Sequence, residues 1–204
     1  MAGRGTLAGV PRLLLLLLLL VGCRGAEDRG DRPLLQRYPI RGHVKWKEEI
    51  ARDGRLAVLE REERWVESAP SVWDVTTLDV ATQTPFYRAR YALTEEGLAQ
   101  TAVLDGDRVV PVNPPRLALP PRPRPGATWN VSHVVGPQRS ERSCEIAAYA
   151  DCRGGLEVRC TTRYGDGRKV EVKNRYCEGV GIVGYESHTD GKIHISSSEL
   201  TDIP

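Results

Sequence analysis

Apolar and polar residues alternate along most of the chain from Tyr38 onward, and long stripes with helical spacing are scarce. Alternation with a period of two is typical of strands that bury one face. Gly, Pro, Asp or Ser interrupts the alternation about every ten residues, as the turns of an antiparallel meander do. The predicted strands are residues 42–47, 55–59, 71–76, 86–91 and 98–104, then 131–135, 145–149, 156–164, 170–176, 182–185 and 192–200.

A proline-rich segment divides these strands into two groups. Residues 111–125 hold seven of the fourteen prolines. Proline lacks an amide hydrogen and favours polyproline II, so the segment is predicted to be a rigid crossover or a sheet edge between halves 38–110 and 126–204. Each half opens with Pro or Gly followed by a tryptophan, at Pro39–Trp46 and Pro125–Trp129. This similarity fits both an internal repeat and a coincidence.

Residues 1–22 break the alternating pattern and are predicted to be a signal peptide. Arg4 and Arg12 precede eight consecutive leucines, Leu13 to Leu20, and small residues follow. A basic start, a short apolar run and small residues are typical of export signals. The apolar run with its small residues would span about 15 Å as a helix, roughly half of a bilayer core. A membrane-spanning anchor is therefore the weaker interpretation.

The leader ends in Leu20-Val21-Gly22-Cys23, which resembles the lipobox of bacterial lipoproteins. The resemblance implies cleavage before Cys23 and attachment of acyl chains such as palmitate to this cysteine. Two or three chains hold a protein on a membrane durably, whereas one does not. The alternative is an ordinary signal peptide with an incidental cysteine. Arg24 stands where a common inner-membrane retention signal has Asp, which favours the outer membrane.

Charge is balanced after the leader. The chain has 29 Lys and Arg residues against 27 Asp and Glu residues, and Arg4 and Arg12 account for the difference. A neutral body argues against nucleic acid as a partner, because nucleic-acid-binding domains are basic. Residues 23–37 are polar and charged, so we expect a flexible tether between the lipid and a single β-rich domain, residues 38–204.

Asp166-Gly167 is a strong turn signal between two predicted strands. A two-residue loop there sets Gly165 opposite Arg168. In that register Cys160 and Cys177 are four positions apart along the strands. The offset corresponds to about 13 Å at 3.3 Å per residue, which is too far for a disulfide.

Four cysteines remain once Cys23 is assigned to lipid, and in an exported chain they favour two disulfides over a metal site. The close cysteine pairs of common zinc sites are missing from the sequence. A turn centred on Cys152 would place Cys144 opposite Cys160 and leave Cys152 near the end of the strand that carries Cys177. We therefore predict the pairs Cys144–Cys160 and Cys152–Cys177, among the three connectivities that four cysteines allow.

Gly179 to Gly184 matches the dinucleotide-binding pattern G-x-G-x-x-G. That site requires a helix directly after the glycines, because the amino end of the helix meets the pyrophosphate. Residues 185–192 contain turn residues and no helical spacing. We therefore expect the glycines to form a bend or bulge between strands, and no cofactor is predicted.

Histidines and tryptophans are the remaining candidates for site chemistry. His188 and His194 could face each other in the last hairpin, but the sequence indicates no third ligand, so no metal site is predicted. The sequence contains neither a G-x-S-x-G elbow nor a His-Glu-x-x-His motif, and no catalytic residues are predicted. Trp46, Trp73 and Trp129 fill the core in the simplest interpretation. Alternatively, they line a concave apolar face for lipid or another hydrophobic ligand.

Several short motifs resemble those of a broad group of bacterial lipoproteins and exported proteins that has no agreed function. The last strands of that group run tyrosine, two residues, G-V-G-[LI]-V, a turn and a final E-L strand. The matching residues are Pro39, Gly42, Trp46, Gly97-Leu98, Gly126–Trp129, Tyr176, Gly179–Val183 and Glu199-Leu200. The resemblance implies a single curved antiparallel sheet or half-barrel, akin to the lipoprotein-carrier fold, and it implies no catalytic residues.

Together these features predict a non-enzymatic, membrane-anchored lipoprotein of the bacterial envelope, with a binding or scaffolding role at the outer membrane facing the periplasm. The expected partners are the membrane, through the lipid, and a hydrophobic ligand or an envelope protein. A carrier or chaperone for lipid is the first alternative, and it requires an open apolar cavity. A hydrolase is the second, and it requires histidines and carboxylates gathered in a cleft.

Overall fold

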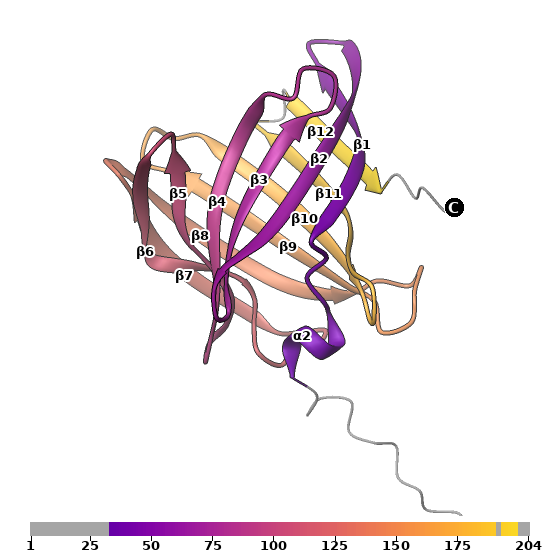
Figure 1. Ribbon diagram of the computed structural model, residues 1–204, viewed down its shortest axis with the longest axis vertical. Helices are drawn as coiled ribbons and strands as arrows, with labels where there is room; N and C mark the ends of the chain where they lie inside the picture. The colour runs from indigo at the N-terminus through magenta and orange to yellow at the C-terminus, as the bar shows by residue number, and fades with distance from the viewer. Residues whose placement is uncertain (1–32, 191–192, 200–204) are drawn as a thin grey trace, which may run out of the picture. The chain divides into compact units, whose positions relative to one another are not determined.

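The computed structural model describes residues 33–190 and 193–199, which are almost entirely antiparallel β-structure and belong to one structural unit, Arg32–Pro204 (Figure 1). The signal peptide 1–22 and Cys23 lie outside the described residues. In chain order the described elements are α2 (Leu34–Arg37), β1 (His43–Arg52), β2 (Arg55–Ala69), β3 (Val72–Asp79), β4 (Pro85–Thr94), β5 (Gly97–Asp105), β6 (Arg108–Leu119), β7 (Thr128–Val135), β8 (Gln138–Ala148), β9 (Leu156–Tyr164), β10 (Lys169–Cys177), β11 (Gly181–Thr189) and β12 (Ile193–Glu199).

The strands form a closed barrel in which sequence neighbours are also spatial neighbours. The predicted mainly β, antiparallel fold is confirmed, and the sheet goes further than the expected half-barrel. It closes because β1 pairs with β12, from Trp46 opposite Glu199 to Arg52 opposite Ile193. Local alternation predicts each strand separately and contains no signal for a pairing between the first strand and the last.

The proline-rich segment is mostly strand. Residues 111–119 belong to β6, and only residues 120–127 connect β6 to β7. The pairing across this seam is short, with Val112 opposite Val135 and Asn113 opposite Val134. Pro114 and Pro115 follow directly and cannot donate to a ladder, which accounts for the end of the pairing. The halves 38–110 and 126–204 are therefore joined edge to edge within one sheet.

The β9–β10 hairpin has a three-residue loop, so the predicted two-residue loop is wrong by one position. The amide of Gly167 donates to the carbonyl of Tyr164 at 2.9 Å, and Tyr164 pairs with Arg168. Gly167 has a φ of +86°, as the last residue of such a loop requires. Cys160 consequently lies opposite Val172.

Two disulfides connect the cysteines in the pairing expected from the sequence. Cys144 and Cys160 are directly opposite each other on β8 and β9, with their Cα atoms 4.1 Å apart. Cys152, in the loop between these strands, bonds to Cys177 at the end of β10, with a Cα separation of 5.8 Å. The one-residue change of the β9–β10 register does not alter this outcome, because Cys160 and Cys177 stay far apart along the hairpin.

The end of the predicted tether 23–37 is structured. Residues Leu34–Arg37 form the short helix α2 at one end of the barrel (Figure 1). Leu34 in the helix and Tyr38 directly after it are buried in the hydrophobic core, together with residues of β5, β6 and β8–β10. Burial of this apolar surface stabilises the segment against the barrel. Residues 34–37 therefore belong to the folded domain and not to the predicted tether.

The glycine motif at residues 179–184 packs against this amino-terminal segment. The amide of Gly179 donates to the carbonyl of Arg37 at 2.8 Å. Gly181 opens β11 with a φ of +91°, and a Cβ there would lie 2.2 Å from the carbonyl oxygen of Pro39. Gly181 and Gly184 belong to strand β11, and no helix follows the motif before Asp190, so its glycines serve close backbone packing.

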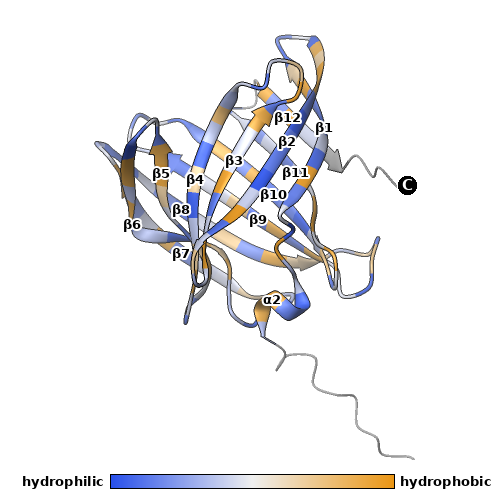
Figure 2. Cartoon of the chain, in the orientation of Figure 1, coloured by the Kyte–Doolittle hydropathy of each residue, from blue (hydrophilic) through white to orange (hydrophobic). Residues whose placement is uncertain are grey.

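The two faces of the barrel wall differ in their residues, since hydrophilic and hydrophobic positions alternate along the strands (Figure 2). On β1, for example, Val44, Trp46 and Glu48 are buried and alternate with half-buried positions. Among residues 33–190 and 193–199, no helix has the length and apolar character that crossing a membrane requires.

Candidate ligand-binding site

The barrel interior contains a cavity of about 510 Å³. Its wall comes from strands on all sides of the barrel and from the segment that includes α2. Aromatic side chains make up much of the apolar lining: Trp46, Trp65, Phe86, Tyr87, Tyr91, Tyr176 and Tyr185. The volume lies within the range of about 300–1,000 Å³ that is typical of small-molecule sites.

Of the three tryptophans predicted to form an apolar ligand face, the structure places one in the cavity. Trp46 lines it, whereas Trp73 and Trp129 pack against the hydrophobic core near α2. The sequence missed Trp65, Tyr87, Tyr91 and the other aromatic residues of the lining. Alternation tells which face of a strand a residue occupies, but it does not tell how far along the barrel axis that residue lies.

One group of charges in the cavity is balanced. The carboxylate of Glu48 accepts a hydrogen bond from Nε of Arg61 at 2.9 Å and another from the hydroxyl of Tyr185 at 3.1 Å. Arg61 also reaches Asp79, at 3.2 Å. A second carboxylate, Glu63, accepts from the indole of Trp65, and burial raises the pKa of Glu63.

A second group, formed by Arg116 and Arg142, is not balanced. Arg116 donates from Nε and Nη2 to Nε2 of His133, at 3.1 and 2.9 Å, and from Nη1 to Gln100 at 3.3 Å. Nε of Arg142 donates to Sγ of Cys144 at 3.3 Å. Within the described part of the chain, neither guanidinium has a carboxylate at ion-pair distance, and both line the cavity.

The electrostatic surroundings of Arg142 disfavour its charged form. Removal from water, together with the positive charge of Arg116, lowers the pKa of Arg142 to about 10. Tyr91 and Tyr176 lie near it, but burial raises the pKa of both phenols, so they remain neutral hydroxyl groups. Arg142 is therefore a charged group of the cavity wall that has no carboxylate at ion-pair distance among the described residues.

Ser140 and His133 form a pair that resembles a nucleophile and its base. The hydroxyl of Ser140 lies 2.9 Å from Nε2 of His133. However, Arg116 donates to the same nitrogen, and Nδ1 of His133 has no hydrogen-bond partner among the described residues. Desolvation first, and then Arg116 and Arg142, lower the pKa of His133 to about 4. Such a weak and fully buried base is unsuited to activating a hydroxyl group.

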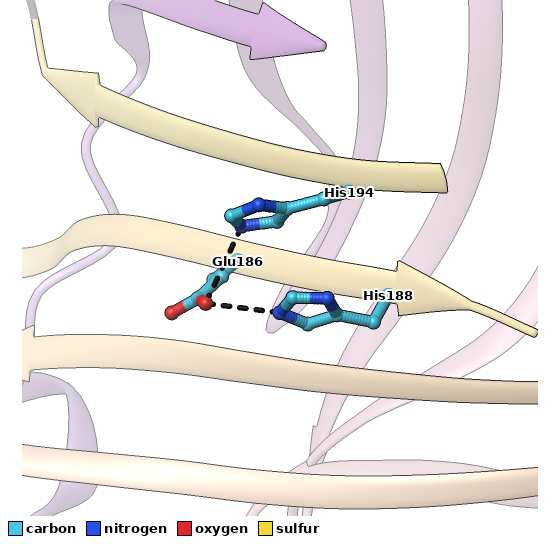
Figure 3. Close-up of side chains that lie close together, drawn as sticks. All are labelled: Glu186, His188 and His194. Atoms are coloured by element: carbon cyan, nitrogen blue, oxygen red, sulfur yellow. Dashed lines mark hydrogen bonds and ion pairs between the residues drawn. The ribbon is translucent and has the colours of Figure 1, made fainter. Parts of the chain in front are cut away.

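A separate cluster brings Glu186 and His188 of β11 together with His194 of β12 (Figure 3). Oε1 of Glu186 accepts a hydrogen bond from Nε2 of His188 at 3.0 Å and lies 3.4 Å from Nε2 of His194. The two imidazole rings stack with their centroids 4.1 Å apart. The two histidines face each other as the sequence suggests, and Glu186 is the third side chain of the cluster, which sequence reasoning missed. Its position two residues before His188 on a strand places both side chains on one face, which was the available signal.

No protein-family model matches the chain, and no curated protein matches it. Two solved bacterial structures are similar to its fold at low sequence identity. One, provisionally described as an exported protein with a YmcC-like fold from Bacteroides fragilis, is 14% identical, with 80% of this chain and 96% of that chain covered and a TM-score of 0.39. The other, provisionally described as a lipoprotein from Parabacteroides distasonis, is 12% identical, with 80% and 95% covered and a TM-score of 0.39. Similarity at this distance has no bearing on function.

Proposed function

We propose that the protein is a lipid-anchored, non-enzymatic binding protein of the bacterial envelope that holds a hydrophobic ligand with an anionic group inside its barrel. The observation that carries the proposal is the cavity of about 510 Å³ with an aromatic wall and two arginines that lack a carboxylate partner among the described residues.

The size of the barrel favours a ligand-filled interior. Side chains just fill a barrel of about eight strands, or leave room for one small ligand, and wider barrels enclose more space. The strands β1–β12 close one barrel, and its hydrophobic core occupies the part around Leu34 and Tyr38. The remaining interior is bounded by large rigid aromatic rings. Such walls bury an apolar chain by the hydrophobic effect without needing to match its shape in detail.

The unbalanced arginines favour an anionic group on the ligand. Burying a charge without a partner is unfavourable, whereas a carboxylate or phosphate beside a guanidinium forms short charge-assisted hydrogen bonds. Arg116 on β6 and Arg142 on β8 are separated by β7 in the sheet, and the charge of each acts on His133 of β7. Because Arg116 also acts electrostatically on Arg142, the two guanidinium groups are close enough for one anionic group to interact with both. The ligand class is therefore a single-chain amphiphile with a carboxylate or phosphate head.

The location of the protein is supported by its sequence. The leader 1–22 and Cys23 resemble a lipoprotein signal, and the acyl chains would hold the barrel beside a bilayer, which is the source of such amphiphiles. Transfer or storage of a membrane-derived lipid then requires binding and release only. We accordingly propose that the ligand is anionic, that the protein is located at the outer membrane and that it catalyses no reaction.

The first experiment is native mass spectrometry of the full chain, followed by removal of bound lipid and calorimetric titration with laurate and with dodecanol, its neutral counterpart. We expect laurate to bind more tightly than dodecanol. Arg116→Gln and Arg142→Gln should each weaken laurate binding by about tenfold or more, the effect of losing a hydrogen bond to a charged group, and leave dodecanol binding unchanged.

Arg163→Gln is the matched control, because Arg163 is exposed on β9 and does not line the cavity. It should bind both compounds as the parent does. Equal affinity of the parent for laurate and dodecanol would refute the anionic part of the proposal. If no lipid copurifies and neither compound binds, the cavity does not hold a hydrophobic ligand.

A further inference from the structure

The cluster of Glu186, His188 and His194 has the geometry of a metal-binding group. In a tetrahedral site with metal–ligand distances of about 2.0–2.1 Å, the ligand atoms lie about 3.3 Å from one another. Oε1 of Glu186 lies 3.0 Å from Nε2 of His188 and 3.4 Å from Nε2 of His194. All three ligand atoms lie within 4.8 Å of one another. A metal ion therefore needs only a small movement of side chains.

The strand register holds the three side chains on one face. His188 and His194 are directly opposite each other on β11 and β12, and Glu186 precedes His188 by two residues. The stacked rings lie at an interplanar angle of 12°, and both present Nε2 to the carboxylate (Figure 3). Nε2 of His194 is shielded from solvent and makes no hydrogen bond to any described residue. An unpartnered nitrogen aimed at a carboxylate is the arrangement that a metal ion would complete.

Two neighbouring cations fix the orientation of the Glu186 carboxylate. Its other oxygen, Oε2, accepts hydrogen bonds from Lys173 at 3.3 Å and Arg175 at 3.0 Å. The two cations orient the carboxylate and leave Oε1 to the histidines, as outer hydrogen bonds orient metal-ligating carboxylates elsewhere. Their positive charge also limits the affinity for a cation, so binding should be weaker than at a buried structural site.

We propose that Glu186, His188 and His194 bind one divalent transition-metal ion, of the zinc and copper class, with a coordination position left open to solvent. Two imidazole nitrogens and one carboxylate oxygen suit these ions, whereas magnesium and calcium prefer ligand sets made of oxygen. Side-chain exposures of 36% for His188 and 43% for His194 place the cluster at the surface of the protein. The proposal is independent of the cavity and of any ligand within it.

The test is calorimetric titration of the full chain with Zn²⁺ after treatment with a chelator and its removal. We expect one ion per chain in the parent. His188→Gln and His194→Gln should each weaken binding by about tenfold or more, the scale on which even outer-shell changes act. His43→Gln is the matched control, because His43 on β1 also lies 3.0 Å from a carboxylate, Glu62, but has no second histidine.

A second measurement needs no variant. Zn²⁺ should protect His188 and His194 from modification by diethyl pyrocarbonate in the parent chain, as read by mass spectrometry, and leave His43 reactive. Three outcomes would overturn the proposal: no binding near one ion per chain, unchanged binding in the double variant of His188 and His194, or equal loss in His43→Gln. If a variant unfolds, the protection pattern of the parent decides the matter.

Discussion

Arg116 directs two N–H groups of its guanidinium at a single nitrogen, Nε2 of His133, which is completely buried between β6 and β8. Because an arginine cannot accept a hydrogen bond, this nitrogen must be the unprotonated one, and the imidazole is neutral. In the folded protein His133 therefore stays neutral at pH values between about 4 and 6.5, where a histidine in water binds a proton.

His133 should therefore make stability depend on pH. Its pKa falls from 6.5 to about 4 on folding, mainly because of desolvation. Below pH 6.5 the unfolded chain binds a proton that the folded chain does not. The free energy of unfolding contributed by this group is thus fully present above pH 6.5 and decreases by up to about 3 kcal/mol as the pH falls to 4. Urea denaturation of His133→Gln, whose amide can accept from Arg116, should lack this decrease.

Arg163→Gln is the control for that experiment, because Arg163 is exposed on β9 and is not a histidine. Its unfolding should follow the parent across the same pH range. If His133→Gln loses stability as steeply as the parent does, another group is responsible for the pH dependence.

Arg142 should reduce the stability of the empty barrel. Its lowered pKa means that folding disfavours the charged form, which is nevertheless the form present at neutral pH. Arg142→Met, which keeps most of the side-chain volume, should raise the free energy of unfolding of the ligand-free protein by about 1–3 kcal/mol. Arg163→Met on the outside should change it by less than about 0.5 kcal/mol. Destabilisation by Arg142→Met would show that the guanidinium is compensated in the folded state.

Gly181 should tolerate no side chain. Gly181→Ala adds a Cβ only 2.2 Å from the carbonyl oxygen of Pro39, at a positive φ. We expect a loss of about 2–4 kcal/mol in urea denaturation. Gly167→Ala separates the two causes, because Gly167 has a similar φ of +86° with no atom near the new Cβ. It should lose only about 1–2 kcal/mol; equal losses in both variants would assign the whole effect to φ.

Cys23 should carry the entire attachment to the membrane. Cys23→Ala is expected to abolish both acyl labelling and fractionation with membranes, because the charges from Cys23 onward balance and give little net attraction to anionic lipids. Arg24→Asp should keep the label and serves as the control. A Cys23→Ala chain that still sediments with membranes would contradict the lipoprotein prediction.

The features that the sequence predicted correctly are those that depend on strands adjacent in the chain. Alternation placed most strands, and turn positions were accurate enough to pair Cys144 with Cys160, because an error of one residue at Asp166-Gly167 leaves the other hairpins unchanged. Leu34 was assigned to the tether for a related reason: two adjacent leucines in a charged segment are too short a run to show a periodicity that predicts docking. What it packs against is contributed by strands far along the chain.

The residues of the candidate sites were harder to predict than the strands, because contacts between strands decide which side chains come together. Trp46 and Trp73 have similar sequence surroundings, yet only Trp46 reaches the cavity. The balance of Arg61 by Glu48 and the lack of balance at Arg142 arise from contacts between strands, which composition cannot reveal. Glu186 could have been found from the spacing Glu186-x-His188, since strand residues two apart share a face.

The pairing of β1 with β12 also determines the order in which the protein can assemble. The hydrogen-bonding edge of β1 has no partner until the last strand of the chain is available, and contacts between such distant segments form slowly. Until then the chain presents two bare strand edges, which can pair with other molecules. We therefore expect the interior to be enclosed late in folding, and a chain that lacks the β1–β12 pairing to aggregate more readily than the complete barrel.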